Sequence, residues 1–392
     1  MKDEKINKWF DRAIIYQILI DRFAGYDPKK DWTKPDFIGG NIKGIIDKLP
    51  YLKNLGVNTL WISPFYKTSA YHGYHITDFY EIDPHFGTKK ELKRLIDLSH
   101  QNNMHIIADF VPNHVSRLHP FFQKAISEKN SPYKKWFYFT KWPNQYHCFL
   151  SVNELPKLKL KNPETKNHII NAAKYWLSFG LDGYRLDHVI GPSNSFWKQF
   201  THEIKKEYPS TWLIGEAWMQ GIQWNELKTI QIPWKRLKWL RNRPLDSVLR
   251  NYIPFLDGVL DFTAQQLFQY HICQQHGSPK QLKKGLQHHY KKFPSDFSLP
   301  LFLDNHDMNR VLFQCGNQIQ KLKKAAEIQF SIDQPIIMYY GTEQSITQKK
   351  SVWSTAHHGD LLARKPMPWQ DIRKNDELYD FYRNLIKRRK NR

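Results

Sequence analysis

Short apolar runs alternate with amphipathic segments along the chain. The runs are short, mostly apolar and rich in β-branched and aromatic residues, which is typical of parallel strands buried on both faces. We expect strands at Ala13–Leu19, Thr59–Ser63, His105–Val111, Gly183–Leu186, Trp212–Gly215, Gly258–Asp261, Leu299–Phe302 and Pro335–Tyr340. Between strands, apolar residues recur at helical spacing, as in Ile45–Leu55, Lys89–Asn102, Glu164–Phe179 and Phe196–Glu207. Eight strands alternating with helices predict an α/β fold, a (β/α)8 TIM barrel.

The alternation is interrupted once, after the third predicted strand. Residues 115–163 are rich in aromatic residues but lack a clean helical period, and the stretch is too long for an ordinary strand-to-helix loop. We therefore expect residues 1–114 and 164–392 to form the barrel, and residues 115–163 to form a small inserted domain on its C-terminal face. Its aromatic residues, Trp136, Trp142 and Tyr146, suit either the core of the insert or a platform for sugar rings.

The composition is that of a globular protein, with 41% hydrophobic and 24% charged residues among 392. No stretch approaches the roughly 18 consecutive apolar residues of a membrane span. The N-terminus shows no apolar signal core, so we expect a cytoplasmic protein without a membrane partner. Three cysteines lie far apart without metal spacing, which argues against a disulfide framework.

The net charge of +22 and the aromatic content of 15% point to different partners. Strong positive charge suits a polyanion, whereas many aromatic rings suit stacking on nucleobases or on the apolar faces of sugars. The basic residues are spread along the chain and cluster only near Lys387–Arg392. A solvated basic surface explains the charge more simply, so we do not expect a nucleic-acid partner, and binding of another polyanion remains an alternative.

Polar residues gather directly after four of the apolar runs. The four segments are Asp109-Phe110-Val111-Pro112-Asn113-His114, Gly183-Tyr184-Arg185-Leu186-Asp187-His188, Gly215-Glu216-Ala217-Trp218 and Asp304-Asn305-His306-Asp307. Because parallel strands end at the same rim of a barrel, these side chains should converge on one cleft. A single acidic residue at a strand end often caps the following helix. If all four segments were only structural, each would need its own unrelated reason for its polar residues, so a shared site explains them better.

Two carboxylates on neighbouring strands suit glycoside hydrolysis, with one as nucleophile and the other as proton donor. Arg185 stands two residues before Asp187, so both side chains face the same side of the strand. A guanidinium there keeps Asp187 ionised. Glu216 lies in an apolar setting that raises its pKa and keeps it protonated. His114 and His306 can donate hydrogen bonds to sugar hydroxyls.

These four segments resemble, in order and spacing, the conserved regions of the α-amylase family of glycoside hydrolases. Further matches are Ile20-Asp21-Arg22-Phe23, Trp61-Ile62-Ser63-Pro64, His72-Gly73-Tyr74 and Tyr340-Gly341-Thr342-Glu343, so that the resemblance spans nearly the whole chain. Leu155-Pro156-Lys157-Leu158 resembles the segment that marks the neopullulanase-like and cyclomaltodextrinase-like branch. Members of that branch often prefer maltooligosaccharides, cyclodextrins or pullulan.

The resemblance implies a role for each site residue. It implies that Asp187 is the nucleophile, Glu216 the general acid/base and Asp307 a third carboxylate that holds the sugar's hydroxyls. The implied substrate-binding residues are Tyr74, His72, His114, Arg185 and His306. On this basis we expect a retaining hydrolase that cleaves α-1,4-glucosidic bonds in maltooligosaccharides, cyclodextrins or starch-like polymers. The alternatives are a 4-α-glucanotransferase and a non-catalytic glycan-binding protein on the same barrel.

The chain departs from the family pattern in three places. Many members bind calcium beside the position of Asn113 with acidic residues from the insert, but residues 115–161 offer only Glu128 and Glu154, so we expect no cofactor and no metal. Ile190-Gly191 stand where many amylases have Lys-His, which leaves the leaving-group preference open. We also expect no C-terminal β-sandwich domain and no N-terminal dimerising domain, which favours a monomer.

Overall fold

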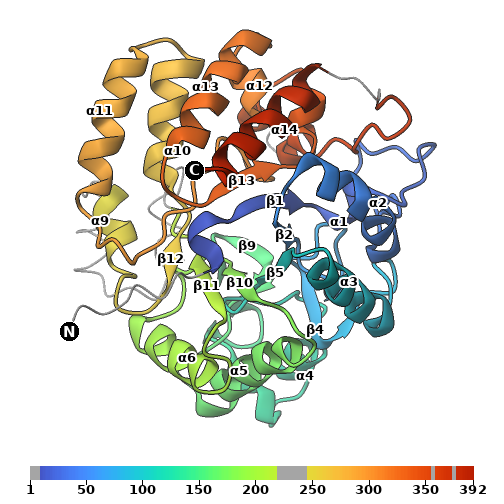
Figure 1. The fold of residues 1–392 in the computed structure, drawn as a ribbon. Coiled ribbons are helices and arrows are strands. Elements are labelled where there is room, and N and C mark those ends of the chain that lie inside the picture. Colours follow the sequence, from blue (N-terminus) through green and yellow to red (C-terminus); the bar gives the residue numbers. More distant parts are fainter. Residues whose placement is uncertain (1–8, 219–244, 355–357, 373–376) are drawn as a thin grey trace.

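The computed structural model describes residues 9–218, 245–354, 358–372 and 377–392. Residues 1–8, where the sequence shows no apolar signal core, lie outside the described residues. A ring of parallel strands stands at the centre, surrounded by helices (Figure 1). Its sheet runs in the order β12-β11-β10-β5-β2-β1-β13. These strands are β1 (Ile14–Ile18), β2 (Thr59–Ile62), β5 (His105–Phe110), β10 (Gly183–Leu186), β11 (Trp212–Gly215), β12 (Gly258–Val259) and β13 (Ile336–Tyr339).

The seventh strand of the barrel is irregular. The predicted strand Leu299–Phe302 forms only single parallel bridges, from Ser298 to Gly258 of β12 and from Leu301 to Ile336 of β13. Pro300 lacks the backbone N–H that a regular ladder needs, although its carbonyl accepts a hydrogen bond from Asp261 N at 3.1 Å. These contacts close the ring between β12 and β13, so the predicted (β/α)8 barrel is confirmed.

Helices cover the outside of the ring, and side-chain caps set where several begin. The longer helices are α2 (Ile42–Leu55), α3 (Lys89–Gln101), α5 (Pro163–Leu177), α6 (Asn194–Glu207), α10 (Phe262–Phe268), α11 (Pro279–Tyr290), α13 (Ile319–Ser331) and α14 (Glu377–Lys390). Short elements are η1 (Trp9–Arg12), α1 (Ile20–Phe23), α9 (Leu245–Arg250), η3 (Gln269–Cys273), α12 (Val311–Gln314), η4 (Thr342–Gln344), η5 (Val352–Ser354) and η6 (Gly359–Ala363). The Asn41 side chain accepts from Gly44 N, so α2 begins three residues before the predicted Ile45.

The strands bury apolar residues on both faces, because successive side chains point alternately into the barrel and toward the helices. Inside the ring, Ile15, Trp61 and Ile337 belong to one cluster. Phe10 of η1 stacks on Trp212 with ring centroids 4.9 Å apart and closes the N-terminal end of the barrel. Within the described residues, no helix is long and apolar enough to cross a membrane.

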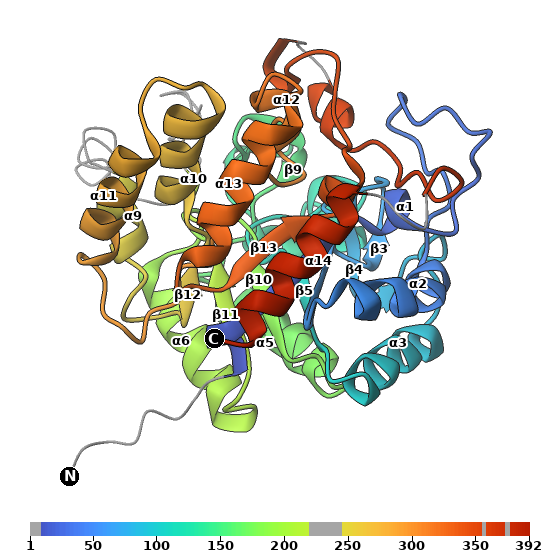
Figure 2. The same cartoon turned by 45° about the horizontal axis from the view of Figure 1, so that its top comes forward.

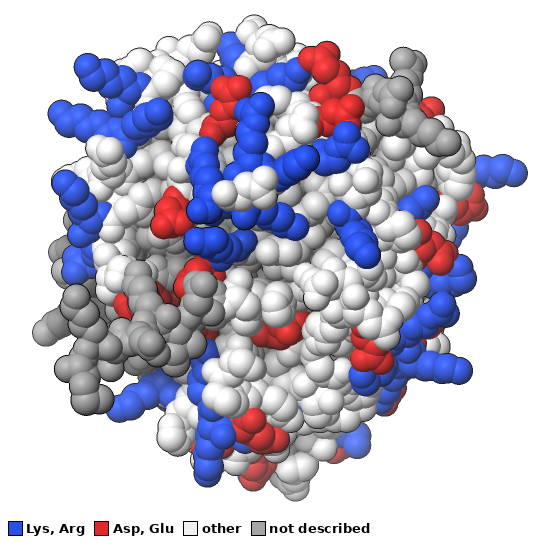
Figure 3. All heavy atoms as spheres, in the orientation of Figure 1, with Lys and Arg blue, Asp and Glu red and all other residues white. Residues whose placement is uncertain are grey.

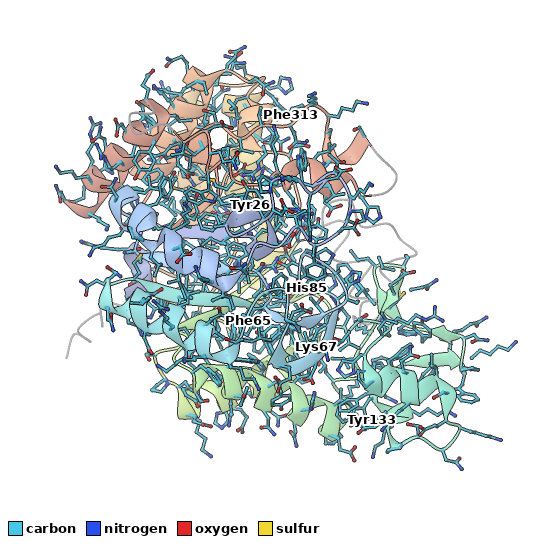
Figure 4. All side chains as sticks on the ribbon, turned by 90° about the vertical axis from the view of Figure 1, so that its right-hand side faces the viewer. Tyr26, Phe65, Lys67, His85, Tyr133 and Phe313 are labelled. Atoms are coloured by element: carbon cyan, nitrogen blue, oxygen red, sulfur yellow. The ribbon has the colours of Figure 1, made fainter. Side chains whose placement is uncertain are left out.

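Residues 115–163 project beyond the end of the barrel at which the strands finish, as the position of Tyr133 shows (Figure 4). They form α4 (Pro120–Ser127), η2 (Pro132–Trp136) and the strands β6 (Phe139–Lys141), β7 (Gln145–Tyr146), β8 (Cys148–Phe149) and β9 (Val152–Pro156). The hairpin of β3 (Tyr66–Thr68) and β4 (Ile76–Ile82) precedes them. Trp136 is buried and packs against Phe121 and His168, which favours a core role for this ring. The domain boundaries remain a prediction.

The basic residues of α14 gather on the opposite face, at the N-terminal end of the strands. Helix α14 packs beside α13 (Figure 2) and ends in the run Lys387–Lys390. Lys and Arg side chains crowd this part of the surface (Figure 3). Cations at a helix C-terminus are stabilised by the helix dipole, so the position at the end of α14 explains this basic cluster without a binding partner.

Candidate active site

A single buried guanidinium lies beneath the rim of the barrel and binds three carboxylates. Arg185 on β10 is paired in register with Asp109 on β5, and both are fully buried. Arg185 Nη1 donates to Asp109 Oδ1 at 2.5 Å and to Asp187 Oδ1 at 2.9 Å, while Nη2 forms an ion pair with Glu216 Oε1. The predicted pairing of Arg185 with Asp187 is present, and Glu216 shares the same guanidinium.

Asp307 lies opposite this cluster and has two basic partners of its own. His306 Nε2 lies 3.0 Å from Asp307 Oδ2, and Arg364 Nη2 donates to Asp307 Oδ1 at 2.9 Å. Gln17 on β1 contacts His306 Nδ1 at 2.7 Å and orients the imidazole. Although burial opposes ionisation, His306 and Arg364 lower the pKa of Asp307, so this carboxyl stays charged.

Tyr74 joins the two halves of the site. Its hydroxyl donates to Asp109 Oδ2 at 2.9 Å, and its ring stacks on His306 with centroids 5.2 Å apart and planes 11° apart. Gly73 precedes it with φ +88°, and a Cβ there would stand 2.1 Å from Pro64 O. Glycine is therefore needed at this turn. His72 Nδ1 accepts from Tyr74 N at 3.2 Å, which fixes the loop further.

A cavity of about 400 Å³ opens between these groups. Its lining residues are His72, Tyr74, His75, His114, Phe149, Leu150, Leu155, Asp187, His188, Glu216, Trp218, His306, Asp307, Trp353, Asp360 and Arg364. Seven of the eight predicted site residues line it, and Arg185 lies underneath. Burial lowers the pKa of His114 to about 3, and the buried Nε2 atom of this histidine has no hydrogen-bond partner. A neutral His114 is thus ready to bond a ligand in the cavity.

Asp187 and Glu216 share one guanidinium and repel each other when both are charged. Burial raises the pKa of both groups although Arg185 opposes the rise, and the repulsion from Glu216 adds to it for Asp187. The expectation that the guanidinium alone keeps Asp187 ionised is therefore wrong, because burial outweighs it. Two carboxyls on one guanidinium do not both ionise easily, so the pair favours a state that holds one proton. A pair with one charged and one protonated carboxyl combines a nucleophile with an acid.

The structure adds residues that sequence reasoning did not place in the site. Arg364 comes from the segment after the last strand, and its side chain also donates to the hydroxyl of Tyr71. His188 lines the cavity, and its backbone N–H donates to Glu216 Oε2 at 3.2 Å. Trp61 Nε1 donates to Asp109 Oδ2 at 2.7 Å. His188 and Trp61 stand within the quoted sequence motifs, which is the signal that could have found them. No local pattern indicated the Arg364–Asp307 pair.

The surroundings of Asn113 include a buried lysine side chain. Asn113 Oδ1 is buried without a hydrogen-bond partner, but the ammonium group of Lys157 lies in this region and donates to Gly191 O at 2.9 Å. Glu128 and Glu154 are exposed. Within the described part of the chain, no group of three or more His, Cys, Asp or Glu side chains is placed to hold a metal. A hard dication that needs six to eight oxygens would meet a lysine here.

The (β/α)8 barrel and the carboxylate-lined cleft at its C-terminal rim have the architecture of a glycoside hydrolase. The chain belongs to the alpha-amylase family, because residues 17–392 match the family model "Alpha amylase, catalytic domain". The resemblance stated from the sequence motifs is thus confirmed.

Individual relatives agree with the predicted branch. The chain is 38% identical over 385 residues to Alpha-amylase 2 of Dictyoglomus thermophilum, covering 97% of this chain and 64% of the relative. It is 31% identical over 408 residues to Neopullulanase 2 of Thermoactinomyces vulgaris, covering 97% and 63%. The solved structure of the cyclic alpha-maltosyl-(1→6)-maltose hydrolase from Arthrobacter globiformis superposes with a TM-score of 0.81 at 26% identity, covering 97% and 83%. The chain thus spans just under two thirds of the length of these two curated relatives.

Proposed function

We propose that this chain is a retaining α-glucan hydrolase that cleaves α-1,4-glucosidic bonds in maltooligosaccharides, cyclodextrins or starch-like polymers. The main support is that Asp187 and Glu216, from neighbouring strands, bind the two terminal nitrogens of one guanidinium. This arrangement favours the short carboxyl separation of retaining enzymes, about 5–5.5 Å, over the about 6.5–9.5 Å of inverting ones. The names of the relatives, among them a neopullulanase and cyclomaltodextrinases, support the substrate class.

The reaction proceeds in two displacements. The Asp187 carboxylate attacks the anomeric carbon while Glu216 transfers its proton to the departing glycosidic oxygen, which leaves a glycosyl ester on Asp187. The Glu216 carboxylate then takes a proton from water, whose oxygen attacks the same carbon and releases Asp187. Asp307 stays ionised and accepts hydrogen bonds from sugar hydroxyls, and these bonds strengthen as the ring distorts.

Neighbouring side chains hold the sugar at the cleavage point. The ring of Tyr74, fixed by Asp109 and by stacking on His306, offers a flat apolar surface to one sugar face. His114 Nε2 and His306 bond the hydroxyls at the edge of the ring. Arg185 is a positioning residue, because it holds Asp187 and Glu216 without lining the cavity.

The test is the cleavage of maltotriose and maltoheptaose by the Asp187→Asn and Glu216→Gln variants. We expect each change to lower kcat/KM by at least about a thousandfold. Asp257→Asn, which removes a carboxylate paired with Lys205 away from the cavity, is the matched control and should retain activity. Unchanged cleavage in either site variant would refute the proposal.

Two product measurements refine it. Proton NMR of the first product should show the α-anomer, whereas a β-anomer would contradict retention. Products longer than maltotriose would show that a sugar, rather than water, captures the glycosyl ester, and would replace hydrolysis with 4-α-glucanotransfer.

We also propose that the barrel needs no divalent cation beside Asn113, because the side-chain nitrogen of Lys157 already bonds the backbone there. Burial lowers the pKa of Lys157 to about 7, and its bond to Gly191 O ties residues 115–163 to the loop after β10. A metal chelator should therefore shift the melting temperature by less than about 1 °C, since no bound ion is removed. A larger drop that calcium reverses would contradict this proposal.

A further inference from the structure

A cavity of about 600 Å³ opens at the N-terminal end of the strands, on the side of the barrel opposite the active site. Its lining residues lie at or just before the starts of four neighbouring strands, β1, β2, β5 and β13, and at the end of α14. We propose that this cavity, which we call the basic cavity, binds a small phosphorylated ligand through its phosphate oxygens. No described residue lines both this cavity and the active site, so the proposal does not depend on the proposed function.

The charged residues of the basic cavity are mostly cations. The cavity is lined by Arg12, Arg389, Lys390 and Arg392, together with one acidic residue, Asp333. Among the described residues, none of the four cations forms an ion pair with a carboxylate. The dipole of α14 explains the cations on that helix, but Arg12 stands on η1, near the other end of the chain. The tertiary structure thus concentrates positive charge in one hollow, and such a hollow attracts an anion.

Arg389 is fixed in the wall of the basic cavity by uncharged groups. Its Nη1 atom donates to Phe330 O at 3.1 Å and to Ile332 O at 2.5 Å, and its Nη2 atom donates to Gln334 O at 2.5 Å. These bonds hold the guanidinium at the end of α13, and pre-organisation of this kind lowers the entropic cost of binding. Because carbonyl groups carry no net charge, they leave the positive charge of Arg389 available to a ligand.

The guanidinium groups of the basic cavity repel one another. Burial lowers the pKa of Arg389, and Asp333 opposes this change. The charges of Arg392 and Arg12 lower the pKa further. A phosphate group between these side chains replaces repulsion by attraction. Its oxygens match the planar fork of a guanidinium, and charge-assisted hydrogen bonds of this kind are stronger than those between neutral groups.

The size of the basic cavity favours a small ligand over a nucleic acid. Its volume of about 600 Å³ lies within the range of about 300–1,000 Å³ that is typical of small-molecule sites. A nucleic acid carries its charges along an extended line, and a single hollow meets few of them. The cavity also has room for more than a phosphate group. Asn103 and Ser331, which are exposed in its lining, can bond the hydroxyl groups of an organic part.

The experiment is calorimetric titration of the full chain, near pH 7 and at low salt, with inorganic pyrophosphate and separately with glucose 6-phosphate. We expect saturable binding, which the double variant Arg12→Gln/Arg392→Gln should weaken at least about tenfold, or about 1.4 kcal/mol. Ser331→Glu places a carboxylate among the same cations and should weaken binding as well. The control Arg94→Gln/Arg250→Gln removes the same charge from exposed positions of α3 and α9 that do not line the cavity, and it should keep the wild-type affinity.

The outcomes separate a built site from general attraction by net charge. Tighter binding of one of the two compounds shows whether the basic cavity takes free or sugar-bound phosphate. Equal losses in the two double variants, or no saturable binding of either compound, overturn the inference. A single-stranded oligonucleotide that binds more tightly than both compounds, and loses affinity equally in the two double variants, also overturns it, because that behaviour belongs to an extended basic surface. None of these measurements requires glucan cleavage, so the inference and the proposed function stand or fall separately.

Discussion

A buried charge cluster on the outer side of β12 predicts that the protein loses stability as the pH becomes alkaline. His289 on α11 is 1% exposed and lies between two carboxylates, with Nδ1 2.8 Å from Asp246 Oδ1 and Nε2 3.0 Å from Asp261 Oδ1. Lys292 Nζ bonds the second oxygen of Asp246 at 2.6 Å. Burial lowers the pKa of His289, but the two carboxylates outweigh it and raise the pKa to about 9.

The sign and size follow from proton linkage. An unfolded histidine titrates near pH 6.5, so the folded state keeps this proton up to a pH about 2.5 units higher. At about 1.36 kcal/mol per unit, the protonated His289 contributes about 3 kcal/mol to the free energy of unfolding. Because the folded pKa is raised, the contribution is complete below pH 6.5 and is lost as the pH rises through about 9.

The assay is urea unfolding followed by tryptophan fluorescence at pH 6 and pH 9.5. His289→Gln should be less stable than the wild type by about 3 kcal/mol at pH 6 and by much less at pH 9.5. His202→Gln, at an exposed position of α6, is the control for general effects of pH and should follow the wild type at both values. A stability difference for His289→Gln that stays the same at both pH values would refute the reasoning.

Three further predictions concern the site itself. Arg185→Lys should lower kcat on maltotriose by about a hundredfold with little change in KM, because one ammonium cannot replace a planar fork that bonds three carboxylates; an equal loss in KM would contradict a positioning role. Gly73→Ala should lower the free energy of unfolding by about 1–3 kcal/mol and reduce kcat, since φ +88° and the contact with Pro64 O displace Tyr74; circular-dichroism melting and steady-state kinetics check it, and an unchanged melting curve would contradict it. Burial raises the pKa of Glu216, so the alkaline fall of kcat/KM should begin at a pH above about 4.3, the ordinary pKa of glutamate. A pH profile that already falls at that value would count against Glu216 as the acid.

Local patterns predicted the strands well where both faces are buried. The structure reproduces Gly183–Leu186 and Trp212–Gly215 with the predicted bounds, because a short, mostly apolar run bounded by polar residues leaves little freedom in a barrel. The seventh strand was predicted as regular and is irregular. Pro300 in the middle of the run already carried that information, since proline cannot donate to a ladder.

The partners of the site residues were harder to predict than the residues themselves. The order of polar groups at the strand ends indicated Asp187, Glu216 and Asp307, because all parallel strands finish at one rim. Nothing near Asp307 in the sequence indicated Arg364, which is 57 positions away. Trp353, which lines the active-site cavity, likewise gave no signal, since a tryptophan outside the predicted strands and helices is compatible with core packing as well as with exposure.

The amino-acid sequence by itself determined the alternation of strands and helices, the rim on which the acidic groups stand and the family. Each of these depends on short-range periodicity or on motif order, which the chain carries locally. Only the tertiary structure decided that one guanidinium binds Asp109, Asp187 and Glu216. It also decided that Lys157 donates to Gly191 O and that the basic cavity opens at the N-terminal end of the strands. These features depend on distances and burial between segments far apart in the chain, and charge interactions and pKa values change steeply with both.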